Sequence, residues 1–196
     1  VNVPSSVIEI GDRAFCGCQS LATMKLPIGL KTIRSHAFQE TGFQHFNFPL
    51  TVESIGNSAL SCCEELESVI LPPKLEIIPD EAFQCCSKLK DISIPKSVAY
   101  VGTSAFERCR LTHLDLSRCD LTTIGRSAFA GCLQLKNVLF PRTRLKRIEE
   151  RTFEHCSSLT HLWIPPTVKY IDNRAFANCT SLLSVEVPET LKRVRF

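Results

Sequence analysis

Apolar residues recur along the chain at a nearly constant interval of about 23 positions. The recurring pattern is Pro-x-x-Val-x-x-Ile-x-x-x-Ala-Phe-x-x-Cys-x-x-Leu-x-x-Val-x-Leu, and it covers the whole sequence. One unit holds too few apolar residues to enclose a core, whereas stacked units align equivalent residues into continuous apolar columns. We therefore predict a single solenoid over residues 1–196, with eight units and a partial ninth. The units begin at Pro4, Pro27, Pro49, Pro72, Pro95, Ser117, Pro141, Pro165 and Pro188.

Each unit contains the signature of one short strand. The segment Leu-x-x-Val-x-Leu alternates apolar and polar positions, as a half-buried strand does, and the Pro that follows ends the strand because it lacks an amide donor. We expect one parallel strand per turn and a brief helical turn at Ala-Phe on the convex side, which makes an α/β repeat solenoid. A tight bend is expected where glycine follows the Ile, at Gly11, Gly56, Gly102 and Gly125.

Two columns are nearly uniform. Phe occupies its position in every unit except the one with Leu60, and Cys follows three residues later except at Thr41. We interpret the cysteines of this column as small buried residues, which accounts for much of the odd total of eleven without a disulfide framework. The columns contain Phe15, Phe38, Phe83, Phe106, Phe129, Phe153 and Phe176, and Cys18, Cys63, Cys86, Cys109, Cys132, Cys156 and Cys179.

In these columns the chain resembles the BspA-type leucine-rich repeats, which carry the same Ala-Phe-x-x-Cys-x-x-Leu signature, and the resemblance spans all eight units. It implies a right-handed leucine-rich-repeat horseshoe. The family includes bacterial and protist surface proteins, several regarded as adhesins for host or matrix proteins, and it shares no catalytic residues. The resemblance thus implies a protein-binding segment of a cell-surface adhesin. Val1–Val3 and Phe196 read as parts of unfinished units, so we expect a segment of a longer array.

Composition and charge narrow the classes of partner. With 44% hydrophobic and 22% charged residues the chain is not of the disordered class, and no apolar stretch is long enough for a transmembrane segment. Residues 117–196 carry 13 Lys and Arg against 7 Asp and Glu, whereas residues 1–116 carry 10 against 13. This asymmetry can orient an acidic partner on approach, while the net charge of +3 is too small to argue for nucleic acid.

The sequence lacks the groups that catalysis requires. Its five histidines lie at unrelated repeat positions, and no phosphate-binding glycine loop or helix-borne zinc motif occurs, so we expect neither an enzyme nor a cofactor. Cys62 and Cys85 form a possible surface thiol pair or disulfide, because they precede the cysteine column on adjacent turns. A zinc site that adds Cys63 and Cys86 is disfavoured by the ligand spacing, and we predict no metal.

The strand residues that alternate with buried ones form the predicted concave face. Most are polar, but Leu139 and Trp163 are adjacent apolar exceptions. An aromatic anchor with polar neighbours is typical of interface hot spots, which makes this patch the predicted contact with a protein partner. The alternative is an ordinary surface with one exposed tryptophan. The predicted patch contains Trp163, Leu139, His161, Asn137, Asp115 and His113.

A cluster of cations follows the strands of the later units. We predict a basic edge that either keeps the protein solvated or contacts an acidic protein, a glycan or a phospholipid; nucleic acid is disfavoured because no aromatic residues interleave. The units that begin at Ser117 and Pro141 have 24 residues, which predicts a local bend beside this edge. The edge contains Arg142, Arg144, Lys146, Arg147, Arg118 and Lys169, with Lys192 and Arg193 on the next turn.

The sequence is also compatible with two further functions. A column of reduced cysteines suits a cytoplasmic interaction scaffold, although buried thiols also survive outside cells. Unfinished ends suit a structural subunit of a large assembly, whose neighbours would cover them.

Overall fold

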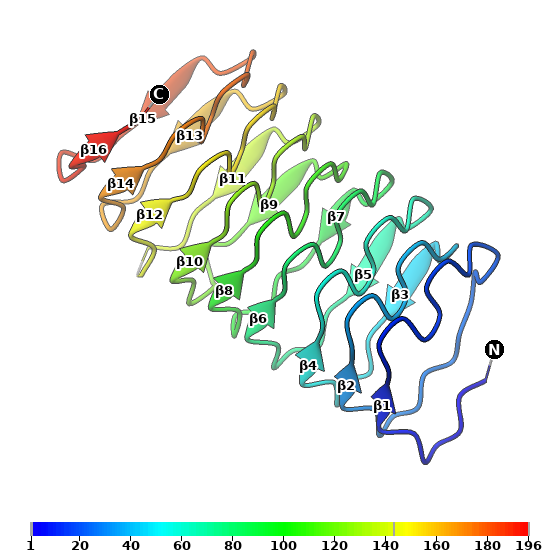
Figure 1. The fold of residues 1–196 in the computed structure, drawn as a ribbon. Coiled ribbons are helices and arrows are strands. Elements are labelled where there is room, and N and C mark those ends of the chain that lie inside the picture. The colour runs from blue at the N-terminus through cyan, green and yellow to red at the C-terminus, as the bar shows by residue number, and fades with distance from the viewer. Residues whose placement is uncertain (1, 143, 196) are drawn as a thin grey trace.

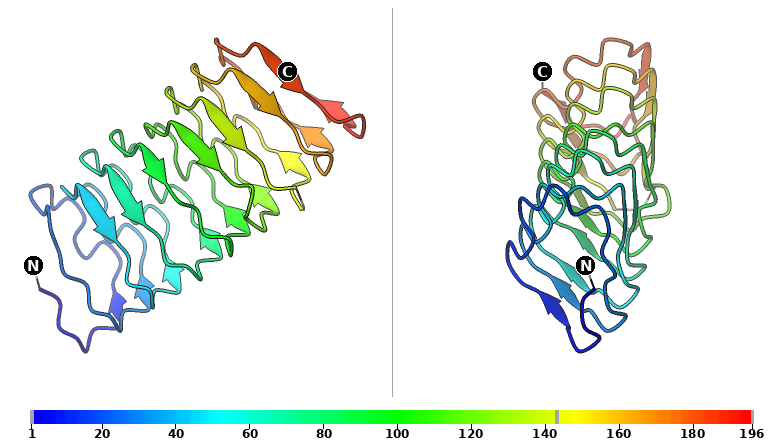
Figure 2. Two further views of the ribbon diagram at one scale, coloured as in Figure 1. Left: turned by 180° about the vertical axis from the view of Figure 1, so that it is seen from behind. Right: turned by 90° about the vertical axis from the view of Figure 1, so that its right-hand side faces the viewer.

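A computed structural model describes residues 2–142 and 144–195; Val1, Thr143 and Phe196 lie outside the described residues. The coils follow one another in a single column from the N-terminus to the C-terminus (Figures 1 and 2). A ladder of mostly three-residue strands, here called the long-strand face, confirms the predicted parallel strands in every full unit except the first, where Lys25 forms only an isolated bridge with Asn2. Its members are β3 (His45–Asn47), β5 (Ser68–Ile70), β7 (Asp91–Ile92), β9 (His113–Asp115), β11 (Asn137–Leu139), β13 (His161–Trp163) and β15 (Ser184–Glu186).

The register of this ladder matches the columns predicted from the sequence. Phe46 pairs with Val69, and Leu114 pairs with Val138, so equivalent residues lie on top of one another. In β11 the middle residue Val138 is buried and its two neighbours are exposed, as alternation requires. The ladder is interrupted between β7 and β9 and again between β11 and β13, where no register pairing occurs among the described residues.

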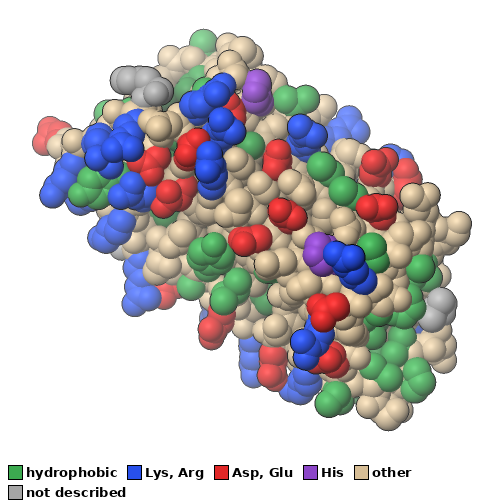
Figure 3. All heavy atoms as spheres, in the orientation of Figure 1, with side chains coloured by type: hydrophobic (Ala, Val, Ile, Leu, Met, Phe, Trp, Pro, Cys, Tyr) green, Lys and Arg blue, Asp and Glu red, His purple; other side chains and the backbone are tan. Residues whose placement is uncertain are grey.

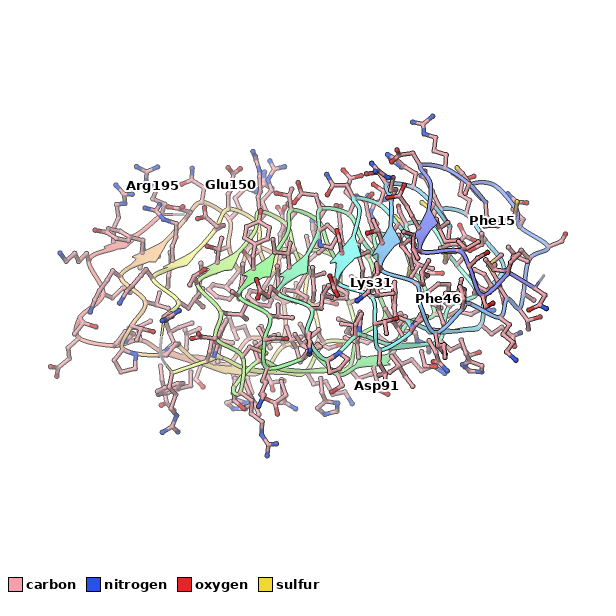
Figure 4. The ribbon with its side chains drawn as sticks, turned by 90° about the horizontal axis from the view of Figure 1, so that it is seen from below. Phe15, Lys31, Phe46, Asp91, Glu150 and Arg195 are labelled. Atoms are coloured by element: carbon pink, nitrogen blue, oxygen red, sulfur yellow. The ribbon has the colours of Figure 1, made fainter. Side chains whose placement is uncertain are left out.

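A second ladder of two-residue strands corrects the prediction of one strand per turn. The Ile column is buried and paired in register, as in Ile33 with Ile55 and Ile78 with Val101. A strand of two residues is too short to show alternation in the sequence. Figure 4 places Asp91, on β7, on one side of the column and Glu150 and Arg195 on the other. The short strands are β1 (Glu9–Ile10), β2 (Thr32–Ile33), β4 (Ser54–Ile55), β6 (Ile77–Ile78), β8 (Tyr100–Val101), β10 (Thr123–Ile124), β12 (Arg147–Ile148), β14 (Tyr170–Ile171) and β16 (Arg193–Val194).

The Ala-Phe segment forms hydrogen-bonded turns instead of the predicted helical turn, and no helix occurs in residues 2–142 and 144–195. Alternate amides face different partners: the Glu107 amide donates within the turn to Ser104 (3.1 Å), whereas the Phe106 amide donates to Ala128 of the next coil (2.8 Å). Ser104 and Arg108 adopt left-handed φ values of 51° and 59°. In a helix these amides would donate to carbonyls of the same segment. Neighbouring coils would then lack a third ladder of hydrogen bonds between them. The α component of the predicted fold class is therefore not found.

Three of the glycines after the Ile column, Gly56, Gly102 and Gly125, allow close approach of coils, whereas a Cβ on Gly11 would meet no atom within 4 Å. A Cβ on Gly56 would lie 2.3 Å from the amide nitrogen of Ser35 in the preceding coil, and its φ is not positive. The two glycines with positive φ are Gly17 and Gly131. Each lies four residues after the first left-handed residue of its own turn. The expected tight bend is thus a contact between backbones.

The predicted Phe and Cys columns form the core together with buried Leu, Ile and Val residues. Cys18 is an exception to the predicted burial: it is exposed, because no earlier coil among the described residues covers it. Phe106 stacks on Phe83 and Phe129 with ring centroids 5.2 and 5.4 Å apart and nearly parallel rings. The Cys109 thiol donates to the Phe83 carbonyl of the preceding coil (Sγ to O, 3.1 Å), and burial raises its pKa well above the usual range. The column therefore adds a hydrogen bond between coils to its apolar packing. The same donation is made by Cys63, Cys86, Cys132, Cys156 and Cys179.

Candidate functional site

The predicted contact patch lies on three neighbouring strands of the long-strand face. Strand β9 pairs with β11, so His113 lies opposite Asn137 and Asp115 opposite Leu139. Leu139 is 55% exposed and Trp163, on β13, is 40% exposed. All six predicted patch residues are exposed. The structure thus brings them together on one solvent-facing surface.

Arg142, a residue of the predicted basic edge, contacts the tryptophan of this patch. The Arg142 guanidinium carbon lies 5.6 Å from the centroid of the Trp163 ring, at cation–π distance. Arg142 belongs to the loop that follows β11, and Trp163 belongs to the next coil. The two predicted surfaces therefore meet at this contact, which steadies the ring by about 0.5–1 kcal/mol.

The remaining cations of the basic edge have local partners or lie around the corner of the column. Arg144 pairs with Asp120 at 3.2 Å, both being exposed. Arg147 is the first residue of β12, and Lys146 and Lys169 immediately precede β12 and β14. The Lys169 ammonium donates to the Pro166 carbonyl (3.1 Å). Figure 3 shows Lys and Arg side chains gathered over the C-terminal coils. The predicted basic edge therefore extends around the column, from the loops after the long strands to the short strands.

Arg147 lies at the centre of a paired cluster on this edge. It donates to Asp172 (2.8 Å), and this hydrogen bond raises the pKa of the guanidinium. Its guanidinium also lies 4.8 Å from the ring centroid of Tyr170, and Arg193 lies 5.6 Å from the same ring. Sequence reasoning missed Tyr170, although the spacing of 147, 170 and 193 places all three in one column.

Asp115 is held by its own loop. The Ser117 hydroxyl and amide donate to it at 2.6 and 2.9 Å, which lowers its pKa, and Arg118 adds a smaller effect. Asp115, Arg118, Asp91 and His113 contribute to a hollow of about 470 Å³ where the ladder is interrupted between β7 and β9. This end of the patch is polar, in contrast to the apolar end at Trp163.

The predicted thiol pair is half-buried, and both thiols are free. Cys62 and Cys85 have left-handed φ values of 57° and 59°, in the column that also contains Gly17 and Gly131. Burial raises the pKa of the Cys85 thiol, and the neighbouring Cys62 raises it further. Within the described residues, no group of three or more His, Cys, Asp or Glu side chains is placed to hold a metal ion. None of these residues forms a helix long and apolar enough to cross a bilayer.

Comparison with known families decides the classification. The model of the BspA-type leucine-rich repeat region matches residues 1–112 and 76–195, in six copies. The chain belongs to this family. No curated protein matches the chain significantly.

Solved structures of leucine-rich repeat proteins share the fold. A T. pallidum leucine-rich repeat protein is 25% identical with a TM-score of 0.65, covering 98% of this chain and 79% of that one. A Faecalibacterium prausnitzii leucine-rich cell surface protein is 26% identical with a TM-score of 0.57, covering 94% of this chain and 58% of that one. A Bacteroides ovatus leucine-rich repeat protein is 27% identical with a TM-score of 0.51, covering 98% and 67%. The chain thus spans only part of each of these proteins.

Proposed function

We propose that the chain is a non-catalytic protein-binding module whose partner docks on the long-strand face over β9, β11 and β13. The observation that carries this proposal is the exposure of Leu139 and Trp163 side by side on a face that is otherwise mostly polar. Exposed aromatic and aliphatic anchors with a polar surround are typical of interface hot spots. Arg142 limits the motion of the Trp163 ring, so less side-chain entropy is lost on binding.

Charge favours an acidic protein as the partner. Residues 117–196 contain 13 Lys and Arg against 7 Asp and Glu, and the patch lies mostly in this part of the chain. A positive potential over a binding face raises the association rate of an acidic partner and makes it depend on salt. An anionic glycan is a further ligand with the same electrostatic requirement.

A place on a cell surface, with an adhesin role, is supported by the family and by the similar F. prausnitzii cell surface protein. A second candidate, an intracellular interaction scaffold, is favoured by the eleven free cysteines, because extracellular proteins tend to pair theirs. Thiol titration of protein isolated from its natural host discriminates between them. Eleven free thiols favour the scaffold, and a Cys62–Cys85 disulfide favours the surface.

The binding face is tested with three variants on a biosensor against a panel of purified matrix and serum proteins. Trp163→Ala is expected to weaken binding about 30-fold or more, as loss of a hot spot of about 2 kcal/mol does. Leu139→Ser should weaken it several-fold. Ile70→Ser is the matched control, because Ile70 occupies the same column on β5 with a similar exposure of 57%. A partner bound equally by wild type and by Trp163→Ala would remove this face from consideration.

A further inference from the structure

In two coils the loop between the cysteine column and the long strand is shortened. This loop lies on the side of the column opposite the loops of the basic edge. The 23-residue units place two residues between Cys and Leu, as in Cys86-x-x-Leu89, and the Leu89 amide closes this loop on Cys86 (3.0 Å). The unit that begins at Pro95 has only Arg110 between Cys109 and Leu111. The longer loops of the neighbouring coils contribute Ser87, Leu133 and Gln134 to the wall of a hollow at this short loop.

A hollow of about 480 Å³ lies at this short loop. Its opening depends on Gly131, which takes the left-handed position between Arg108 and His155 in the same column. A Cβ at Gly131 would lie 3.1 Å from the Arg108 Cγ, so a side chain there would crowd the hollow. The lining residues are Ser87, Arg108, Cys109, Arg110, Gly131, Leu133, Gln134 and His155.

The rim of this hollow is cationic and its wall is apolar. The Arg108 side chain is 72% exposed, and its ion pair with Glu107 is long, at 3.9 Å. Arg110 is exposed and forms no ion pair within the described part of the chain. Leu133 is 57% exposed beside these cations. The combination suits a ligand with a negative charge and an apolar group close together.

The other short loop separates the effect of shape from that of charge. The unit that begins at Pro27 also has 22 residues, and its short loop at Gly42 forms a hollow of about 410 Å³. That hollow is lined by Glu40, Glu64 and Glu65, of which Glu65 pairs with Lys88 (2.6 Å). Loop shortening therefore produces a hollow in both coils, and the side chains give the two hollows opposite charge.

We propose that the cationic hollow is a second binding site, which takes a peptide segment of a partner protein that carries Asp or Glu next to an apolar side chain. The carboxylate lies between Arg108 and Arg110, and the apolar side chain packs on Leu133. Arginine binds carboxylates through paired N–H donors, which favours this group. A peptide is favoured over a sugar because the described residues that line the hollow include no Phe, Tyr or Trp ring on which a sugar could stack. This site is separate from the long-strand face and does not rest on the function proposed for it.

The test uses two synthetic peptides and amide chemical shifts of the ¹⁵N-labelled chain. The acidic probe is acetyl-Gly-Leu-Glu-Glu-Gly-amide, and the neutral probe replaces both Glu by Gln. The acidic probe is expected to shift the amides of Arg108, Arg110 and Leu133 and to leave Glu40 and Gly42 unchanged. Its affinity should exceed that of the neutral probe at least five-fold and fall as salt is raised from low to physiological strength.

Variants then assign the contacts. Arg110→Gln and Leu133→Ser should each weaken binding about two- to five-fold, as expected for exposed contacts. Lys96→Gln removes the same charge from the opposite edge and should have no effect. All three positions are exposed, and equal urea midpoints would show that the fold is kept. Equal binding of the neutral probe, shifts confined to other residues, or no shift at millimolar acidic probe would overturn the proposal. Acetate that shifts the same amides with equal affinity would reduce the site to a plain anion site and overturn the peptide assignment.

Discussion

Truncation of one ring in the phenylalanine column should reveal how the stacked coils share stability. Phe106 is fully buried between Phe83 and Phe129, and its ring faces both of them. Phe106→Ala removes the ring from a site that stacked backbones prevent from collapsing. The expected loss is about 3–5 kcal/mol, the range for a buried Phe replaced by Ala. This is a large fraction of the roughly 5–15 kcal/mol by which a folded domain of this kind is stable.

Two matched variants make the reasoning quantitative. Phe176 occupies the same column in a later coil, is only half-buried and has a ring neighbour at Phe153 (5.6 Å). Phe176→Ala should therefore cost about 1–2 kcal/mol, since a partly exposed ring gives up less apolar burial. Phe106→Leu should cost about 1–2 kcal/mol, because it loses ring stacking but little volume, and Leu60 already fills this column fully buried.

The assay is urea unfolding followed by fluorescence of Trp163, the only tryptophan, together with far-ultraviolet circular dichroism. Coincident transitions by both signals would justify a single free energy of unfolding for each variant. If Phe176→Ala cost as much as Phe106→Ala, or if Phe106→Leu cost as much as the alanine variant, the stacking argument would be refuted.

Three further predictions concern the cysteines. Cys109→Ala should lower the free energy of unfolding by about 1–2 kcal/mol through the lost thiol–carbonyl bond and packing, measured by urea unfolding; no change would show that the bond is without value. Burial raises the pKa of Cys132 to about 12, so between about pH 9 and 12 the unfolded chain loses a thiol proton that the folded chain keeps. The free energy of unfolding should therefore fall as pH rises through this range, by up to about 1.4 kcal/mol per pH unit from this group. The fall should be less steep in Cys132→Ala. A thiol reagent at neutral pH should label only the cysteines that are not buried in the native protein, and all eleven after denaturation, as counted by mass spectrometry; rapid native labelling of Cys86 would contradict the burial. The expected native targets are Cys16, Cys18, Cys62 and Cys85.

The sequence by itself determined the columns, the parallel strands and the exposed strand residues. Both periods, about 23 residues between coils and 2 residues within a strand, can be read from the sequence. Stacking of the coils buries the apolar residues that recur with these periods. Leu139 and Trp163 could be predicted as exposed because each is next to a buried strand residue, Val138 and Leu162. The second strand of each coil was missed because a buried Ile after a single more exposed residue shows no periodicity.

Only the tertiary structure decided what the backbone does at Ala-Phe and which side chains meet between coils. The left-handed turns there occur mostly at residues other than glycine, such as Arg108 and His155, so composition does not reveal them. They persist because alternate amides donate to the next coil, a bond between residues more than twenty positions apart. The contact of Arg142 with Trp163 and the hollow beside Gly131 also join separate coils. Such contacts depend on loop length and side-chain rotamers, which the repeat pattern does not specify.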